Sequence, residues 1–272
     1  MKYCKNNHNN RQRAFTLAEV FLPYFAGRRQ SAFTLAEVLI TLGVIGIVAA
    51  MTLPAVVNKY QEKATVTKVK KFYNLMSQGY MFALEKYGTP DLWGFGDRDS
   101  AETEGDDEYV AVNAVKFRDI LLEQVKVLKR CDKSSKSLEC GVSRVAKYEN
   151  GDVVTTVSQS ASALLADGSS VRVLVSSGSC NMVRGKGKLL RNDCGWVYID
   201  VNGTKEPNTY GKDIFPFHVT KYGVIPAGTS DDTSSPFSHR WGLGRTAWVV
   251  INGNMDYLHC NDLSWSGKIK CD

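Results

Sequence analysis

Residues 28–57 read RRQSA FTLAEVLITLGVIGIVAAMTLPAVV, in which a basic and polar leader meets a long apolar run. A helix over residues 33–57, rising about 1.5 Å per residue, is long enough to cross a hydrocarbon core of about 30 Å. The run carries a single charge, that of Glu37. A carboxylate at the bilayer centre costs about 2.5–3.5 kcal/mol and less near an interface, so an acid in a membrane helix indicates a function.

The position of Glu37 suggests what this function is. If the chain were cut before Phe33, Glu37 would lie one helical turn from a new α-amino group. The ammonium of one copy would then be able to pair with the carboxylate of another. Such an arrangement is typical of a subunit that polymerises through its membrane helices.

The same stretch resembles the prepilin signal of type IV pilins and type II secretion pseudopilins. The resemblance rests on phenylalanine first (Phe33), Thr34-Leu35 next, glutamate fifth (Glu37), small residues along the helix, and proline at the twenty-second place (Pro54). One position departs from the family pattern, because Ala32 stands where glycine is usual. The resemblance implies that prepilin peptidase cuts between Ala32 and Phe33, and that the new amine of Phe33 is N-methylated.

The resemblance also implies a location and a set of partners. The precursor would reside in the bacterial inner membrane with its C-terminal domain outside. The subunit would then leave the bilayer and join a helical filament, a pilus or a secretion pseudopilus, with other pilins and with the inner-membrane assembly platform. In the filament Glu37 would pair with the Phe33 amine of a neighbour.

Two simpler interpretations of the apolar run remain open. One is an ordinary secretory signal peptide whose apolar region ends near residues 48–50. The acid at Glu37 and the lack of a clean small-x-small cleavage site count against it. The other is a plain single-pass anchor for a soluble domain. Residues 14–20 repeat residues 32–38 but lack the long apolar continuation, so no spanning helix is expected there.

Two signals disagree about orientation. By the positive-inside rule, the lysines that follow the apolar run would place the C-terminal side in the cytoplasm; they are Lys59, Lys63, Lys68, Lys70 and Lys71. The cysteines that remain without the leader form an even set with short spacings, which indicates disulfides in an oxidising compartment; they are Cys131, Cys140, Cys180, Cys194, Cys260 and Cys271. The spacings invite the sequential pairs 131–140, 180–194 and 260–271, although other connectivities and reduced buried thiols stay open. Together with the resemblance, the cysteines favour an extracytoplasmic domain.

Net charge gives little support for nucleic-acid binding. The whole chain carries +6 at pH 7. Removal of residues 1–32 takes away six basic residues and one acid and leaves about +1. The basic character is therefore largely a property of the leader.

The chain is expected to have four parts: a leader (1–32), a transmembrane or filament-core helix (33–57), an amphipathic continuation (58–88) and a globular domain (89–272). In the continuation, apolar residues recur at three- and four-residue steps from Val69 to Tyr87, and Gly88-Thr89-Pro90 is a stop signal. Short β-branched segments with tight turns dominate from residue 153 onward, which favours an antiparallel sheet. The predicted fold class is α+β, a long N-terminal helix packed on a C-terminal antiparallel sheet, as in pilins.

Several further elements are predicted within the globular domain. Residues 112–130 are expected to form a second helix. The predicted strands are 153–157, 163–166, 171–175, 196–201, 214–219, 224–225, 247–251 and 255–258. The turns between strands are expected at Asp167-Gly168, Asn202-Gly203, Lys221-Tyr222-Gly223 and Asn252-Gly253.

Two loops carry residues for possible ligand binding. Segment 200–213 has the oxygen-rich composition of a cation loop, with Asp200, Asn202, Asn208 and Asp213 as weak calcium candidates. Its glycine spacing is not that of an EF-hand, so a hairpin with an ordered loop is the favoured interpretation. If Cys180 and Cys194 pair, the basic run 184–191 would protrude and would be able to touch DNA or an anionic surface, although a solvated loop is the simpler expectation.

Enzymatic function has little support in the sequence. The histidines are scattered, and the sequence contains no Cys-x-x-Cys, His-Glu-x-x-His or Gly-x-Ser-x-Gly motif. We therefore expect a structural subunit without a cofactor, calcium being the one alternative. Two other classes remain open: a tip-located pilin that binds DNA, a surface or a secretion substrate, and a membrane-anchored extracytoplasmic enzyme.

Overall fold

A computed structural model describes residues 33–97, 111–156 and 159–271. The predicted leader, including Ala32, lies outside the described residues, as do residues 98–110, 157–158 and 272. The chain divides into two compact units, Met1–Pro54 and Ala55–Asp272. Helix α1 (Leu35–Tyr87) contributes residues to both units.

The part of α1 in the first unit is apolar and exposed. Thr34 and Glu37 form a capping box at its start, because Glu37 Oε2 accepts hydrogen bonds from Thr34 N at 2.8 Å and Thr34 Oγ1 at 2.9 Å. The Glu37 amide donates to Thr34 Oγ1 at 3.2 Å. By length and composition this helix is able to cross a membrane.

The part of α1 in the second unit has one buried face. The buried residues fall at helical spacing and include Val66, Val69, Phe72, Met76, Tyr80 and Ala83. Two of the lysines that opposed the expected orientation are bound to the globular domain. Lys68 Nζ donates to Val201 O at 2.6 Å, and Lys71 Nζ lies 3.0 Å from Asp167 Oδ2.

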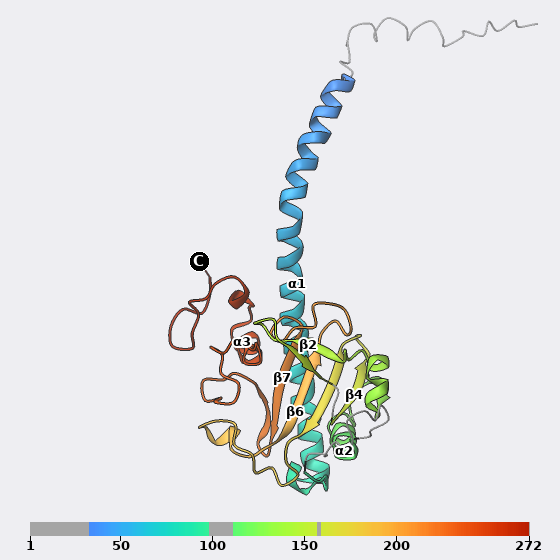
Figure 1. The fold of residues 1–272 in the computed structure, drawn as a ribbon, viewed down its shortest axis with the longest axis vertical. Helices are drawn as coiled ribbons and strands as arrows, with labels where there is room; N and C mark the ends of the chain where they lie inside the picture. Colours follow the sequence, from blue (N-terminus) through green and yellow to red (C-terminus); the bar gives the residue numbers. More distant parts are fainter. Residues whose placement is uncertain (1–32, 98–110, 157–158, 272) are drawn as a thin grey trace, which may run out of the picture. The chain divides into compact units, whose positions relative to one another are not determined.

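A six-stranded antiparallel sheet in the order β1-β4-β5-β6-β7-β8 forms the centre of the domain. Its strands are β1 (Val127–Cys131), β4 (Ser160–Leu165), β5 (Ser170–Val175), β6 (Asp193–Asp200), β7 (Ile214–Thr220) and β8 (Gly223–Pro226). A separate hairpin pairs β2 (Val145–Lys147) with β3 (Val153–Thr155). The other helices are α2 (Val112–Leu121) and α3 (Arg245–Asn252), with short 3₁₀ helices at Pro90–Leu92, Ser134–Cys140, Lys188–Leu190 and Asp256–Leu258. This arrangement confirms the predicted α+β class (Figure 1).

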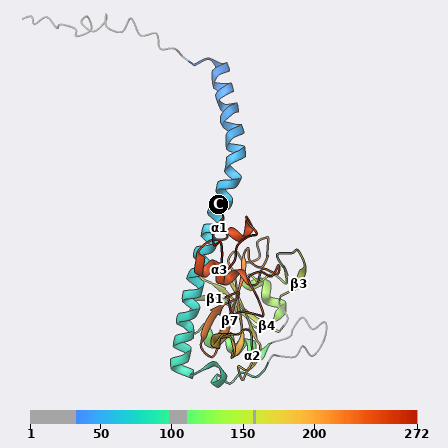
Figure 2. The ribbon, with the colours of Figure 1, turned by 90° about the vertical axis from the view of Figure 1, so that its left-hand side faces the viewer.

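One face of the sheet forms the apolar core with α1 and α2. Alternate strand residues such as Val173, Val197 and Phe217 point into this core, as the period of a strand requires. Phe217 packs between Phe72 and Tyr73 of α1, with ring centroids 5.5 and 6.0 Å away. Figure 2 shows this part of α1 running along the sheet.

The opposite face of the sheet is covered as well, but its residues are polar and aromatic. Arg172 lies over the Tyr198 ring at 3.8 Å and donates to Tyr210 Oη at 3.0 Å. The ring of Trp196 stacks beside the ring of Tyr198, with 5.8 Å between their centroids. Because both faces are covered, most residues of the central strands are buried whichever way they point.

Three predicted elements were wrong. The predicted helix 112–130 ends at Leu121, and Val127–Cys131 is the edge strand β1. The predicted strand 247–251 lies in helix α3, where Asn252-Gly253 is not a hairpin turn but a helix end. Gly253 has a φ of 69°, and its amide donates to Val249 O, as in a glycine C-cap. Residues 256–258 are a 3₁₀ helix rather than a strand.

Other local predictions were confirmed. Asp167-Gly168 lies between β4 and β5, and Lys221-Tyr222 connects β7 to β8. The six cysteines form disulfides between the sequential pairs Cys131–Cys140, Cys180–Cys194 and Cys260–Cys271. Each closes a loop of 9 to 14 residues, a span for which loop-closure entropy contributes about 3 kcal/mol.

Replacement of Phe217 by alanine tests whether this side chain attaches α1 to the sheet. The residue is fully buried, so Phe217→Ala is expected to lower the free energy of unfolding by about 3–5 kcal/mol. Leu128→Ala on β1, where the side chain is 61% exposed, is the control and should change it by less than about 0.5 kcal/mol. Denaturant unfolding of the full chain in detergent measures both values. An equal loss of unfolding free energy in the two variants would contradict the inference that Phe217 attaches α1 to the sheet.

Candidate functional site

The residues predicted to direct assembly lie at the start of α1. Phe33 is 85% exposed, and the apolar side chains from Leu35 to Val57 are exposed along the whole segment. An exposed apolar surface of this size marks a site that contacts a membrane or another protein. The helix continues through Pro54, which lies inside α1.

The capping box gives Glu37 a role that the sequence argument did not identify. Its carboxylate accepts hydrogen bonds from Thr34 at the start of its own helix, so within one chain it already has polar partners. Thr34-x-x-Glu37 is the spacing of a capping box, and this signal was present in the sequence. The predicted pairing with the Phe33 amine of a neighbour would add to this role or replace it.

The four weak calcium candidates lie at the end of β6, where Asp200 is the last residue, and in the loop that joins β6 to β7, which holds Asn202, Asn208 and Asp213. Asp213 orders this loop by accepting hydrogen bonds from Thr209 N at 2.6 Å, Asn208 N at 2.8 Å and Asn202 Nδ2 at 3.3 Å. Asp200 accepts one from Asn202 N at 3.1 Å. These contacts support the ordered-loop interpretation.

Calcium binding by this loop stays a prediction. Among the residues that the structure describes, Asn202 Oδ1 and Asn208 Oδ1 are buried and have no hydrogen-bond partner, as free ligand oxygens would be. In the described ranges, however, no group of three or more His, Cys, Asp or Glu side chains is placed to hold a metal ion. Burial and the neighbouring Asp213 carboxylate raise the pKa of Asp200 to about 8.

A buried charge cluster that the sequence did not reveal lies on the polar face of the sheet. His218 of β7 is fully buried, and its Nε2 lies 2.9 Å from Asp232 Oδ2. Its Nδ1 lies 3.6 Å from Asp193 Oδ1, within ion-pair range. Arg184 Nε contacts Asp193 Oδ2 at 2.8 Å. With a protonated imidazole the cluster holds two positive and two negative charges.

The surroundings of the cluster favour this protonated form. Burial lowers the pKa of His218, but the Asp193 and Asp232 carboxylates outweigh it and hold that pKa above its ordinary value. Burial raises the pKa of Asp232, yet contact with His218 brings it down to about 2. Asp232 also accepts hydrogen bonds from the amides of Gly228, Ser234 and Ser235. The cluster therefore fixes segments 184–193 and 228–235 to the back of the sheet.

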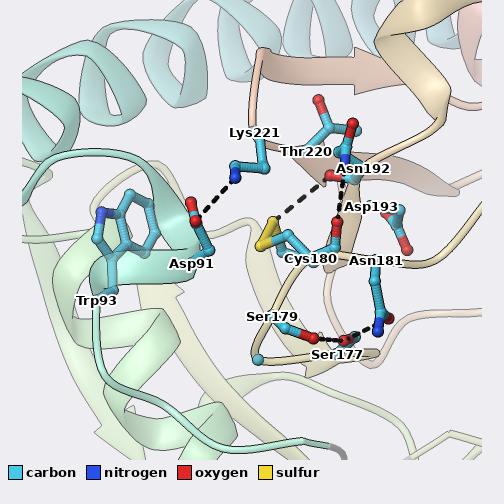
Figure 3. Close-up of a disulfide and its surroundings, with 12 residues drawn as sticks. Asp91, Trp93, Ser177, Ser179, Cys180, Asn181, Asn192, Asp193, Thr220 and Lys221 are labelled. Carbon is cyan, nitrogen blue, oxygen red and sulfur yellow. Dashed lines mark hydrogen bonds and ion pairs between the residues drawn. A yellow bond between two sulfur atoms is a disulfide. The ribbon is translucent and has the colours of Figure 1, made fainter.

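The disulfide loop 180–194 is anchored rather than freely protruding. Arg184, predicted as part of an exposed basic run, points inward to Asp193 and donates to Ser176 Oγ at 2.8 Å. Figure 3 shows the loop ends beside the disulfide, where Asn192 Nδ2 donates to Cys180 O at 3.1 Å. The basic side chains of the loop that remain exposed are Lys186, Lys188 and Arg191.

Comparisons with known proteins identify the N-terminal signal and the family of the chain. Residues 27–53 match the prokaryotic N-terminal methylation motif, so the chain has the prepilin-type signal of pilin-like proteins. Residues 55–266, most of the chain, match the family model described as "Family of unknown function (DUF6613)", and the chain belongs to that family. The comparison with curated proteins and the comparison with solved structures each found no match.

The charge cluster predicts a pH-dependent contribution of His218 to stability. Because its pKa is raised in the folded state, its contribution is complete below the unfolded pKa of about 6.5 and is lost as pH rises through the folded pKa. His218→Gln should lower the free energy of unfolding by about 3–5 kcal/mol at pH 5.5 and by less at pH 9.

Unfolding of the full chain at both pH values measures this difference. His259→Gln is the control, because His259 is exposed in its ion pair with Glu62. This replacement should change the free energy of unfolding by less than about 1 kcal/mol. An effect of His218→Gln that is the same at both pH values would show that the residue acts only by packing.

The raised pKa of Asp200 predicts that this residue destabilises the fold as pH rises. Its folded pKa lies above the unfolded value of about 3.9, so the folded state retains a proton and stability falls as pH rises from about 4 to 8. Asp200→Asn should therefore gain stability relative to the wild type between pH 5 and pH 9 when a chelator is present. A constant difference between the two proteins would contradict the burial of a protonated carboxyl. If calcium binds the loop, adding it at pH 9 should stabilise the wild type more than Asp200→Asn.

Proposed function

We propose that this chain is a structural subunit of a type IV pilus or of a type II secretion pseudopilus. It is cut between Ala32 and Phe33 by prepilin peptidase, N-methylated at Phe33 and polymerised through its apolar helix. The observation that carries the proposal is the methylation motif at 27–53, joined to an exposed apolar helix and a compact domain with three disulfides. The motif and the helix indicate a membrane-anchored precursor.

The exposed helix explains why assembly would be favourable. In an isolated subunit in water, the apolar side chains between Leu35 and Val57 would be exposed to solvent. A bilayer or a bundle of identical helices covers them, and burial contributes about 25 cal/mol per Å². Glu37 is the one acid in this segment, and its pairing with the Phe33 amine of a neighbour would set the register between helices.

A tip-located binding pilin is the second proposal, and the disulfide loop 180–194 favours it. Val183 is 67% and Leu189 51% exposed, beside the exposed cations Lys186, Lys188 and Arg191. An apolar and basic surface of this kind fits DNA or another anionic partner. Low copy number and loss of binding on neutralising these cations would distinguish a tip subunit from a filament-forming one.

Replacement of Glu37 by alanine tests the filament mechanism. Glu37→Ala is expected to be cut and methylated normally, with a mature chain that begins at Phe33 and is about 14 Da heavier than the unmodified one, but to be strongly depleted from the sheared surface fraction. Because Glu37 also caps its helix, Thr34→Val is the decisive control, since it removes the hydroxyl of the capping box and keeps the carboxylate. Thr34→Val should assemble.

Intact and peptide mass spectrometry of the membrane and sheared fractions measures both the processing of the chain and its assembly into the filament. Glu85→Ala, an exposed acid on the same helix in the second unit, controls for loss of charge alone. Normal assembly of Glu37→Ala, or equal loss for Thr34→Val, would contradict the proposed pairing. A chain that begins elsewhere or an uncut precursor would contradict the processing itself.

A further inference from the structure

A polar groove lies in the second unit between α1 and the loop that follows β6. Its volume is about 660 Å³, and it is open to solvent. Residues 58–68 of α1 form one wall, the loop 201–213 forms the other, and Met255–His259 close one side. Lys68, whose Nζ donates to Val201 O, connects the two walls.

The acidic side chains in this groove already have partners. Glu62 Oε1 lies 2.8 Å from His259 Nε2, and Glu206 Oε2 lies 3.8 Å from Lys147 Nζ. Asp213 accepts hydrogen bonds from the amides of its own loop. Each acidic side chain of the groove therefore already has a polar partner within the domain.

Two cations of the groove have no such partner. Lys205 and Lys212 line it and are exposed, and in the described ranges neither side chain makes an ion pair or a hydrogen bond. Lys59 and Lys63 of α1 are exposed as well, but they do not line the groove. The free charge of this surface is positive.

The groove begins where the apolar run ends. Asn58, its first residue, follows Val57 directly in the same helix. At about 1.5 Å per residue, residues 58–62 extend roughly 7.5 Å beyond that end, which is about the depth of one lipid head-group layer. Tyr60 lines the groove and is 73% exposed, and tyrosine is enriched at this depth in membrane proteins.

We propose that this groove binds the phosphate of an anionic phospholipid while the subunit is held in the bilayer by its apolar helix. Lys205 and Lys212 contact the phosphate from the loop. The inference rests on the membrane-anchored stage of the proposed function.

Native mass spectrometry of the full chain, released from lipid nanodiscs, tests the proposal. The discs contain phosphatidylcholine with or without phosphatidylglycerol. The wild type should retain phosphatidylglycerol in preference to phosphatidylcholine. Each neutralised lysine should reduce this preference about fivefold, so Lys205→Gln with Lys212→Gln should reduce it about 25-fold.

The matched control is Lys126→Gln with Lys270→Gln, which removes the same charge from exposed positions outside the groove and should leave the preference unchanged. Equal retention of the two lipids by the wild type would overturn the proposal, as would an unchanged preference in the groove variant. Displacement of the lipid by millimolar inorganic phosphate would also overturn it, by indicating a free-phosphate site. Failure of the wild type to enter nanodiscs would instead contradict the membrane-anchored stage, so the two hypotheses fail separately.

Discussion

The packing of one helical stripe on one face of the sheet is the constraint on which the rest of the domain depends. Val69, Phe72 and Met76 are almost completely buried against residues of β5, β6 and β7. This stripe holds the second-unit part of α1 on the sheet. The covered face must therefore be apolar and well packed, and the other face is free to carry polar groups.

Polar groups on the opposite face of the sheet fix the positions of the loops. Arg172 is held by Tyr198 and Tyr210, and His218 is held between two carboxylates. Buried charges are costly unless they are paired and hydrogen-bonded, so these residues specify where the loops lie more than they add to stability. The same principle applies to Asp213, whose carboxylate organises the loop that forms one wall of the groove. Loops of irregular sequence thereby acquire fixed surfaces.

The sequence was most informative where a local rule decides the structure. The stop signal after Tyr87, the Asp167-Gly168 turn and the helical stripe of α1 depend on nearby residues, and their predictions were confirmed. Predictions failed where tertiary context decides. Asn252-Gly253 suits a hairpin or a helix end equally well, and packing of Trp248 into an aromatic cluster favours the helix. The partners of His218 lie 14 and 25 positions away along the chain, and no spacing rule brings them together.

If the domain is exported, as the proposed function requires, the order of its three disulfides bears on how it folds as it emerges. Each joins a cysteine to the next one in the chain, at separations of 9, 14 and 11 residues. When a chain crosses a membrane from its N-terminus, the second thiol of each pair therefore appears shortly after the first and before the next pair arrives. Oxidation in order of emergence gives the native connectivity directly, and no pair has to wait for a distant part of the chain or exchange with another.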